Sequence, residues 1–203
     1  MDKKFVWKTV IISTAILAFS YNAFSYDLFN YMFDAKIVTH YQQNPYVQKA
    51  LDYPQDPMLG FMHWTHRVYP YGPLWLVMTV PLSFIGLQLF LPTFFLFKLL
   101  MGAAFLGSLY FVGKIFQKIA PERELFGLIF FGLNPLLLIE SVVSAHLDIV
   151  MMFFALWAFY LLLNKKYIVA LLLLFVSIGI KFATVFLLPV FIFYVLLKNK
   201  KLS

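Results

Sequence analysis

Residues 25–72 read SYDLFNYMFDAKIVTHYQQNPYVQKALDYPQDPMLGFMHWTHRVYPYG and separate two long apolar parts of the chain. The stretch carries four carboxylates, three of the four histidines and a run of Tyr, Trp and Pro residues. A connection this long with no apolar span of its own is uncommon unless it has a function. We therefore interpret residues 25–72 as a functional loop that caps a group of apolar helices.

The composition of the chain is that of an all-α integral membrane protein. Of its 203 residues, 63% are hydrophobic and 12% are charged, whereas soluble domains are about half apolar and about a quarter charged. The net charge of +7 comes from short basic clusters beside apolar runs, which is where topology signals lie. We therefore expect membrane lipid and no nucleic acid as a partner. A sequence without cysteine has no disulfide and no Cys-ligated metal.

The apolar runs predict one membrane domain, residues 1–203, with about six spans. We expect the first span at 5–24, a long extracytoplasmic loop at 25–91, and further spans at 92–113, 125–143, 149–163, 168–179 and 183–197. About twenty apolar residues cross a hydrocarbon core of about 30 Å. The run 73–86 is shorter and contains Pro81, so we expect a re-entrant or interfacial helix there.

Basic residues predict the orientation of the chain. Eleven Lys and Arg fall in segments assigned to the inside (Lys3, Lys4, Lys8, Lys114, Lys118, Arg123, Lys165, Lys166, Lys198, Lys200 and Lys201), and three fall in the outer loop (Lys36, Lys49 and Arg67). Cytoplasmic segments carry the excess of Lys and Arg. We therefore expect cytoplasmic N- and C-termini and an outward-facing loop, in a bacterial-type cell membrane.

This topology brings polar residues from distant parts of the chain to one membrane face. The group comprises Asp27, Asp34, His146, Asp148 and Lys181, with Glu140 about one turn below the face and Lys98 inside the second span. Charged groups inside a span are costly and usually face the bundle interior or a polar cavity. The same face therefore holds the candidate site.

Two aspartates of the loop are candidates for acid–base chemistry. Asp27 follows the first span and could act as a general base, or it could be a solvated charge at a helix end. Asp34 lies near the same face if residues 27–39 are helical. There it could assist the base or hold a metal, or it could be a surface charge.

Three cations are candidates for binding phosphate. Lys98 and Lys181 could each act as a point charge, although Lys181 is close enough to a span end to snorkel. Arg67 could pair with an anionic head group or with lipid phosphate.

Pro135 is expected to break or kink the third span. Beyond it, Glu140, His146 and Asp148 would form a polar wall facing the loop, or a hydrogen-bond network between helices. Tyr71 and other loop aromatics could stack on sugar rings or belong to the interfacial belt. A metal site at His40, His63 and His66 has only a weak H-x-x-H signal, and we predict none.

Short motifs in order give the chain a family resemblance. In the loop these are Tyr26-Asp27, Tyr31, Asp34-Ala35, Asn44-Pro45-Tyr46 and Tyr69-Pro70-Tyr71-Gly72-Pro73-Leu74; later come Asn134-Pro135-Leu136, Glu140, His146-Leu147-Asp148 and Lys181-Phe182 to Leu188-Pro189. The set resembles GT-C glycosyltransferases that use polyprenyl-phosphate sugars. Bacterial polyprenol-phosphate-mannose-dependent mannosyltransferases and the catalytic subunit of GPI mannosyltransferase I are similar. The chain departs from the family pattern at Phe29, where many relatives are acidic, and at Ala145, where they have glycine.

The resemblance implies transfer of a hexose, with mannose expected, from a polyprenyl-phosphate sugar to a hydroxyl of a glycan or lipid acceptor. It implies an extracytoplasmic reaction with inversion and Asp27 as general base. We expect Lys98, Lys181 and Arg67 to stabilise the donor phosphate, and Tyr31, Tyr71, Glu140, His146 and Asp148 to contact substrate, with Asp34 assisting Asp27. No cofactor is expected, and a divalent metal is left open.

The relatives are about twice as long, so we expect an N-terminal portion that a second chain could complete. Two other hypotheses remain: a lipid-carrier or solute transporter, and a non-catalytic membrane subunit of a transferase. Transporters usually hold such polar groups near the midplane between repeats. Here the groups lie at the outer face and no repeat is visible, which favours the enzyme.

Overall fold

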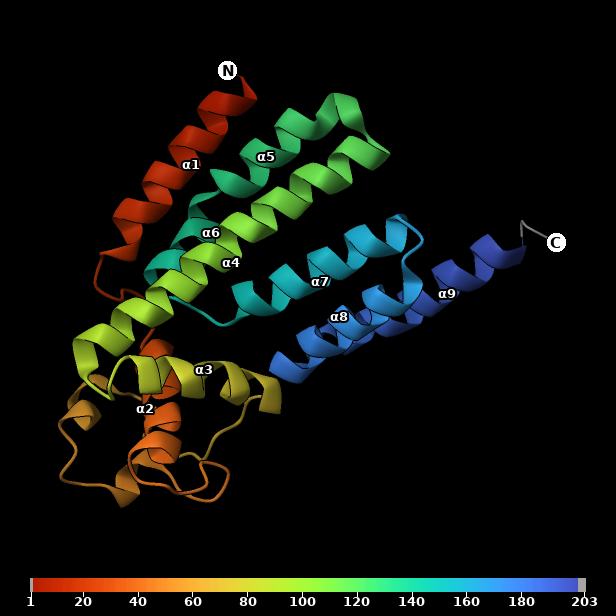
Figure 1. Cartoon of the computed structure of the whole chain (residues 1–203). Coiled ribbons are helices and arrows are strands. Elements are labelled where there is room, and N and C mark those ends of the chain that lie inside the picture. Colours follow the sequence, from red (N-terminus) through yellow and green to blue (C-terminus); the bar gives the residue numbers. More distant parts are fainter. Residues whose placement is uncertain (1, 201–203) are drawn as a thin grey trace.

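The computed structural model describes residues 2–200, and this part of the chain is almost entirely helical (Figure 1). The α-helices are α1 (Lys3–Ala18), α2 (Asp27–Thr39), α3 (Pro73–Ile85), α4 (Phe90–Ile119), α5 (Glu124–Gly132), α6 (Pro135–Leu138), α7 (Asp148–Leu163), α8 (Tyr167–Ile180) and α9 (Leu187–Lys200). Short segments are η1 (Ala50–Asp52), η2 (Pro57–Phe61), η3 (Pro121–Arg123), η5 (Phe182–Phe186) and the π-helix η4 (Ile139–Val143). The predicted all-α fold is confirmed.

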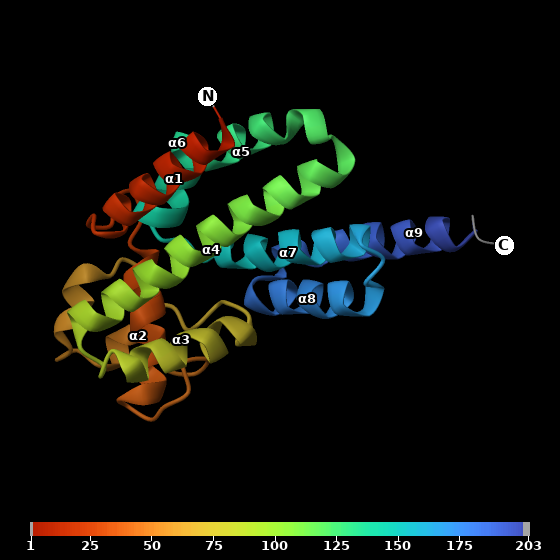
Figure 2. The same cartoon turned by 45° about the horizontal axis from the view of Figure 1, so that its top comes forward.

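The long helices run back and forth between the two ends of the molecule. Figures 1 and 2 show α1, α4 and α5 side by side, α7 against α4, and α8 and α9 beyond α7. The segment 25–72 and α3 close one end, where the turns before α7 and after α8 also lie. This alternation brings loops that are far apart in sequence to one place.

The polar stretch 25–72 contains a buried helix at its start. In α2 the consecutive residues Leu28, Phe29, Asn30 and Tyr31 are at most 2% exposed, and with 3.6 residues per turn these four positions point around the whole circumference of the helix. A helix that is buried on all sides lies in a core. Packing of α2 against α3 and α4 thus fixes the direction in which Asp27, its first residue, projects.

The span predicted at 125–143 is broken at Asn134-Pro135, as expected from the proline. The Asn134 side chain accepts hydrogen bonds from the N–H groups of Leu136 (3.0 Å) and Leu137 (3.4 Å), and Pro135 takes the first helical position. This is a favourable N-cap arrangement. The two halves of the span meet at an angle of 51°, which directs η4 toward the segment that precedes α2.

The span predicted at 5–24 is helical only as far as Ala18. Beyond it, the Ser20 hydroxyl donates to the Leu17 carbonyl (2.6 Å), and the Asn22 amide donates to the Ser144 carbonyl (2.9 Å). Such side-chain bonds to the backbone offer an alternative to continuing a helix. The chain therefore leaves α1 early and approaches the turn before α7.

Among residues 2–200, α4 alone is long and apolar enough to cross a membrane as a single helix. The bent pair Pro121–Gly132 and Pro135–Val143 meets the same criterion together, and α3, α7, α8 and Phe182–Lys198 are apolar but shorter. The structure thus supports one or two of the roughly six predicted spans by this measure.

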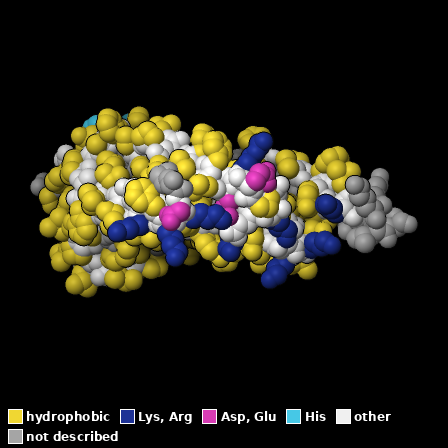
Figure 3. Space-filling view, turned by 90° about the horizontal axis from the view of Figure 1, so that it is seen from above, with side chains coloured by type: hydrophobic (Ala, Val, Ile, Leu, Met, Phe, Trp, Pro, Cys, Tyr) yellow, Lys and Arg dark blue, Asp and Glu magenta, His cyan; other side chains and the backbone are white. Residues whose placement is uncertain are grey.

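The basic clusters lie at the end opposite the segment 25–72. Figure 3, which views that end, shows Lys and Arg side chains distributed along it among apolar surface. Lys3 pairs with Glu124, and Lys118 donates to the Asn164 side chain. These contacts join the start of α1, the turn between α4 and α5, and the turn between α7 and α8.

A close backbone contact joins α3 to α8. The Gly72 N–H donates to the Ile180 carbonyl (3.0 Å), and a Cβ on Gly72 would lie 2.0 Å from the carbonyl oxygen of Gly179. Only glycine permits this approach. Gly72 therefore determines how Tyr71 and Lys181, its neighbours on the two segments, face each other.

Gly72→Ala is expected to lower the free energy of unfolding by about 1–3 kcal/mol or more, because an added methyl group in a filled space forces the backbone to move. Gly60→Ala is the matched control, since nothing lies within 4 Å of a Cβ at Gly60, and a change within about 0.5 kcal/mol is expected there. Chemical unfolding of both variants in detergent micelles measures the difference. Equal stability of the two variants would contradict the close contact.

Candidate active site

An open cavity of about 360 Å³ lies where the loops converge, lined by Asp27, Tyr31, Tyr71, Glu140, His146, Asp148 and Lys181. These seven belong to the ten site residues predicted from the sequence. They come from α2, the segment before α3, η4, the turn before α7, the start of α7 and the residue after α8. The structure brings them together; Asp34, Lys98 and Arg67 are not among the lining residues.

His146 lies between two carboxylates. Its Nδ1 atom is 3.6 Å from Oδ2 of Asp27, and its Nε2 atom is 3.2 Å from Oε2 of Glu140. The side chain of Glu140 is 44% exposed, against 23% for Asp27. The imidazole thus connects a sheltered carboxylate with one that is open to solvent. Each of the two ring nitrogens of histidine can donate or accept a hydrogen bond, so His146 can contact both carboxylates at once.

Asp27 and Asp148 each occupy the first position of a helix. Asp27 begins α2, with its N–H donating to the Ser25 hydroxyl (3.2 Å), and Asp148 begins α7. The N-terminus of a helix favours negative charge. Both helices therefore direct positive dipole ends at the cavity.

Lys181 is the cation of the cavity. Its Nζ atom donates to both carboxylate oxygens of Asp148, at 2.8 and 2.9 Å. Both side chains are about two-fifths exposed, at 41% and 44%, and ion pairs of that exposure contribute little to stability. The pair is thus open to an incoming anion, which Lys181 could bind.

Tyr31, Tyr71 and Arg67 form one wall. The Tyr31 ring is 1% exposed and meets the Tyr71 ring edge-on, with 5.1 Å between centroids. An Arg67 Nη2 group donates to the Tyr71 hydroxyl (2.9 Å), so Arg67 holds the cavity wall from behind. Burial, followed by the nearby Asp27 charge, raises the pKa of Tyr71 to about 12. The phenol therefore stays neutral.

The turn before α7 is tied to the segment before α2. The Ser144 hydroxyl donates to the Ala23 carbonyl (2.7 Å), and the Asn22 amide donates to the Ser144 carbonyl (2.9 Å). Ala145 has a φ of 55°, in the left-handed region that favours glycine. The sequence reasoning missed Asn22 and Ser144. A signal was present: small polar residues where an apolar run stops before its full length.

Lys98 lies in the core, 1% exposed. Its ammonium group donates to the carbonyls of Val142 (2.9 Å) and Val143 (2.7 Å), at the end of η4. Carbonyls at the C-terminal end of a helix lack helical partners, and a buried ammonium group requires acceptors. These contacts occupy Lys98 away from the cavity.

Asp34 is on α2, two turns beyond Asp27. The helix expected over residues 27–39 is present, but the cavity reaches only its first turns, and Asp34 is 8% exposed. Burial raises the pKa of Asp34 to about 7, and the Arg67 charge opposes that shift. Its Oδ2 atom makes no hydrogen bond within the described part of the chain.

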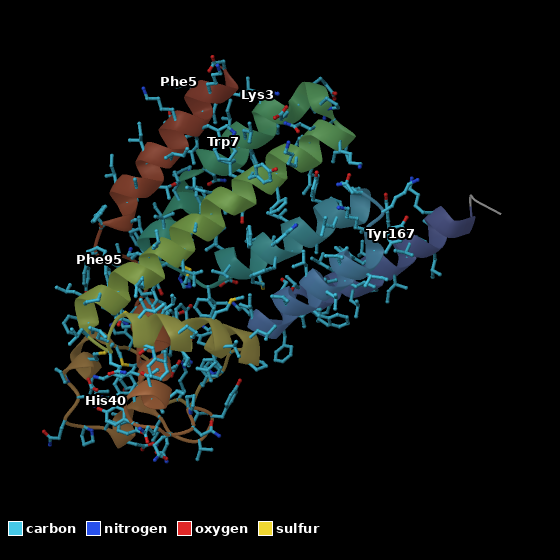
Figure 4. All side chains as sticks on the ribbon, in the orientation of Figure 1. Lys3, Phe5, Trp7, His40, Phe95 and Tyr167 are labelled. Atoms are coloured by element: carbon cyan, nitrogen blue, oxygen red, sulfur yellow. The ribbon has the colours of Figure 1, made fainter. Side chains whose placement is uncertain are left out.

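The loop histidines do not join the cavity. His63 stacks on the ring of Tyr26, with 3.9 Å between centroids, and Figure 4 shows His40 at the end of the molecule opposite Lys3. Within residues 2–200, no group of three His, Asp or Glu side chains is arranged to hold a metal ion.

Asp34→Asn is expected to remove a pH dependence of stability. The unfolded carboxyl ionises near its ordinary pKa of 3.8, whereas the folded one keeps its proton up to about 7. The folded state therefore binds more protons in this window, and the free energy of unfolding falls as the pH rises from about 4 to 7. An amide has no such proton. The free energy of unfolding of the variant should exceed that of wild type by more than about 1 kcal/mol at alkaline pH. In acid the two values should be equal.

Chemical unfolding of both proteins across this pH range is the measurement. Burial acts to raise the pKa of Asp56, but hydrogen bonds from Lys36 and Tyr41 outweigh it and hold the pKa below its ordinary value. The stability that Asp56 contributes is therefore lost only as the pH falls below about 4, outside the window of Asp34. Parallel stability curves for wild type and Asp34→Asn would refute the assignment.

Residues 1–197 match the family described as alpha-(1->6)-mannopyranosyltransferase, N-terminal domain, of the MptA/B type. No curated protein and no solved structure matches the chain. The match covers nearly the whole sequence and confirms the resemblance to GT-C mannosyltransferases that the motifs indicated. The chain therefore belongs to the MptA/B family of alpha-(1->6)-mannosyltransferases and is a glycosyltransferase domain.

Proposed function

We propose that this chain transfers mannose from a polyprenyl-phosphate donor to an acceptor hydroxyl, with inversion, on the extracytoplasmic face of the membrane. One observation carries the proposal: a partly sheltered carboxylate, Asp27, shares a cavity with an exposed cation, Lys181. Base-assisted attack on a sugar phosphate needs both. The transporter hypothesis is not carried further, because the family is one of mannosyltransferases.

In the proposed reaction, Asp27 takes the proton of the acceptor hydroxyl as its oxygen forms a bond to the anomeric carbon. The bond from that carbon to the phosphate oxygen breaks, and the electron pair leaves with the phosphate. Attack opposite the leaving group inverts the anomeric configuration. Lys181 exchanges part of its contact with Asp148 for the phosphate, whose growing negative charge it stabilises.

His146 gives the abstracted proton a way out. It contacts Asp27 through Nδ1 and Glu140 through Nε2, so a proton on Asp27 can pass through the imidazole to the more exposed carboxylate. Tyr31 and Tyr71 offer aromatic edges and a neutral hydroxyl beside Asp27, which suits a sugar ring. Arg67 supports this wall by its hydrogen bond to the Tyr71 hydroxyl, and Asp34 lies near Arg67 behind it.

The membrane placement is part of the proposal. Large apolar side chains are exposed on the helices that are too short to cross a membrane alone. Among them are Ile16 at 66%, Ile168 at 77% and Phe193 at 63%. An apolar surface of this extent indicates contact with lipid or protein. We infer about six spans, with α3 at the interface. Because the basic clusters lie at the opposite end, the positive-inside rule directs the cavity outward.

Mannosyl transfer in proteoliposomes containing the purified chain and polyprenyl-phosphate mannose tests the function. Asp27→Asn should reduce the rate by about 10²–10⁴-fold, the range for loss of a general base. Asp52→Asn is the matched control, because Asp52 is exposed and does not line the cavity. It should leave the rate unchanged.

Two outcomes would contradict the proposal. An Asp27→Asn protein as active as the control would remove Asp27 as the base. A folded wild-type chain that transfers sugar from no polyprenyl-phosphate donor would instead favour the non-catalytic subunit.

A further inference from the structure

We propose that Lys98 is a positioning residue: its buried ammonium group fixes the end of η4 and thereby the turn that holds His146 against Asp27. The catalytic consequence rests on the proposed function, whereas the structural part stands without it. Nothing in the family match assigns a role to this residue.

The contact is specific and fully buried. Lys98, in the first third of α4, donates to the carbonyls of Val142 and Val143 at 2.9 and 2.7 Å. These are the last two residues of η4. Within the described residues no carboxylate lies in ion-pair range of Lys98, and Phe94 offers a ring centroid at 5.5 Å. The two carbonyls are therefore the polar partners that keep the ammonium group in the core.

The end of a π-helix needs such a partner. In η4 the Ser144 N–H donates to the Ile139 carbonyl (2.7 Å), and the His146 N–H donates to the Glu140 carbonyl (3.0 Å). The carbonyls of Val142 and Val143 fall where the helix stops. Carbonyls there lack intrahelical donors and a positive charge is favoured. Lys98, on the neighbouring helix α4, supplies the N–H donors and the positive charge.

The site depends on this end of η4 in two ways. Glu140 belongs to η4 itself, and His146 follows Val143 by three residues. The two residues also contact each other, through Oε2 of Glu140 and Nε2 of His146. Asn22 and Ser144 tie the turn to the segment before α2 on one side. Lys98 anchors it from α4 on the other, so the spacing of His146 from Asp27 has two independent supports.

The surroundings of Lys98 allow the missing group to be replaced chemically. The side chain borders an open groove of about 270 Å³ between α1 and α4, which Thr14, Ala15 and Gly102 also line. Lys98→Ala deletes the equivalent of n-propylammonium. A small amine can reach the vacated position through this groove.

The first test measures mannosyl transfer by Lys98→Ala in proteoliposomes. Misplacement of His146 should lower kcat by about a hundredfold, as displacements of about 1 Å do, and leave the KM for the donor nearly unchanged. Added n-propylammonium should restore much of the rate, while n-propanol and tetramethylammonium should not, because neither provides a charged N–H donor. Ser108→Ala, which removes a fully buried hydroxyl from the same helix, should behave as wild type.

Three results would overturn the proposal. A raised KM with unchanged kcat would make Lys98 a direct ligand of the donor. Equal rescue by n-propanol, whose hydroxyl can donate a hydrogen bond but has no charge, would show that the positive charge of Lys98 is not needed. An inactive Lys98→Ala protein that n-propylammonium does not restore would exclude hydrogen bonding at that position as the cause.

The second test does not need activity and so separates this inference from the proposed function. Hydrogen exchange of the Ser144 and His146 amides is compared in wild type, Lys98→Met and Ser108→Ala. Lys98→Met keeps the length of the stem and removes the donors. Exchange at these amides should rise by about tenfold or more, the factor expected for losing one charge-assisted hydrogen bond. Unchanged exchange in Lys98→Met refutes the anchoring role, whether or not the chain transfers sugar.

Discussion

Backbone groups released by a broken helix must find partners, and in an apolar surrounding only the protein can supply them. This chain breaks its helices at three places and satisfies the released groups with side chains. Asn134 caps the restart after α5, the Ser20 hydroxyl donates to the Leu17 carbonyl at the end of α1, and Lys98 donates to the carbonyls that end η4. The polar site is formed by what these breaks expose.

The breaks also explain why the cavity draws on so many segments. The bend of 51° and the π-helix lie between α5 and the turn that brings His146 to Asp27. Gly72 permits α3 to approach α8 closely enough that Tyr71 and Lys181 share the cavity. Carboxylates at two helix starts and a cation after a third helix then surround one volume. That arrangement suits charge separation between a sugar and its phosphate.

Much of the fold and of the site could be predicted from the sequence, for identifiable reasons. Apolar run lengths located the helices, the proline located the break, and alternation of direction predicted that Asp27, His146 and Lys181 would meet. Side-chain direction around a helix could not be predicted, because it depends on packing partners. For this reason the sequence did not predict that Lys98 donates to backbone carbonyls. It also did not predict that Asp34 is buried near Arg67. The early end of α1 was missed because it depends on Asn22 reaching Ser144, a contact across most of the chain.

The central claim is that the start of α2 meets the turn before α7. The natural absence of cysteine allows a direct test with Asp27→Cys and His146→Cys in one chain. Because these side chains approach within 3.6 Å, a short bifunctional methanethiosulfonate should link them, as detected by mass spectrometry of proteolytic peptides. The pair Asp27→Cys and His40→Cys, separated by about 20 Å along α2, should remain unlinked. Labelling of each single cysteine without any link between positions 27 and 146 would contradict the account.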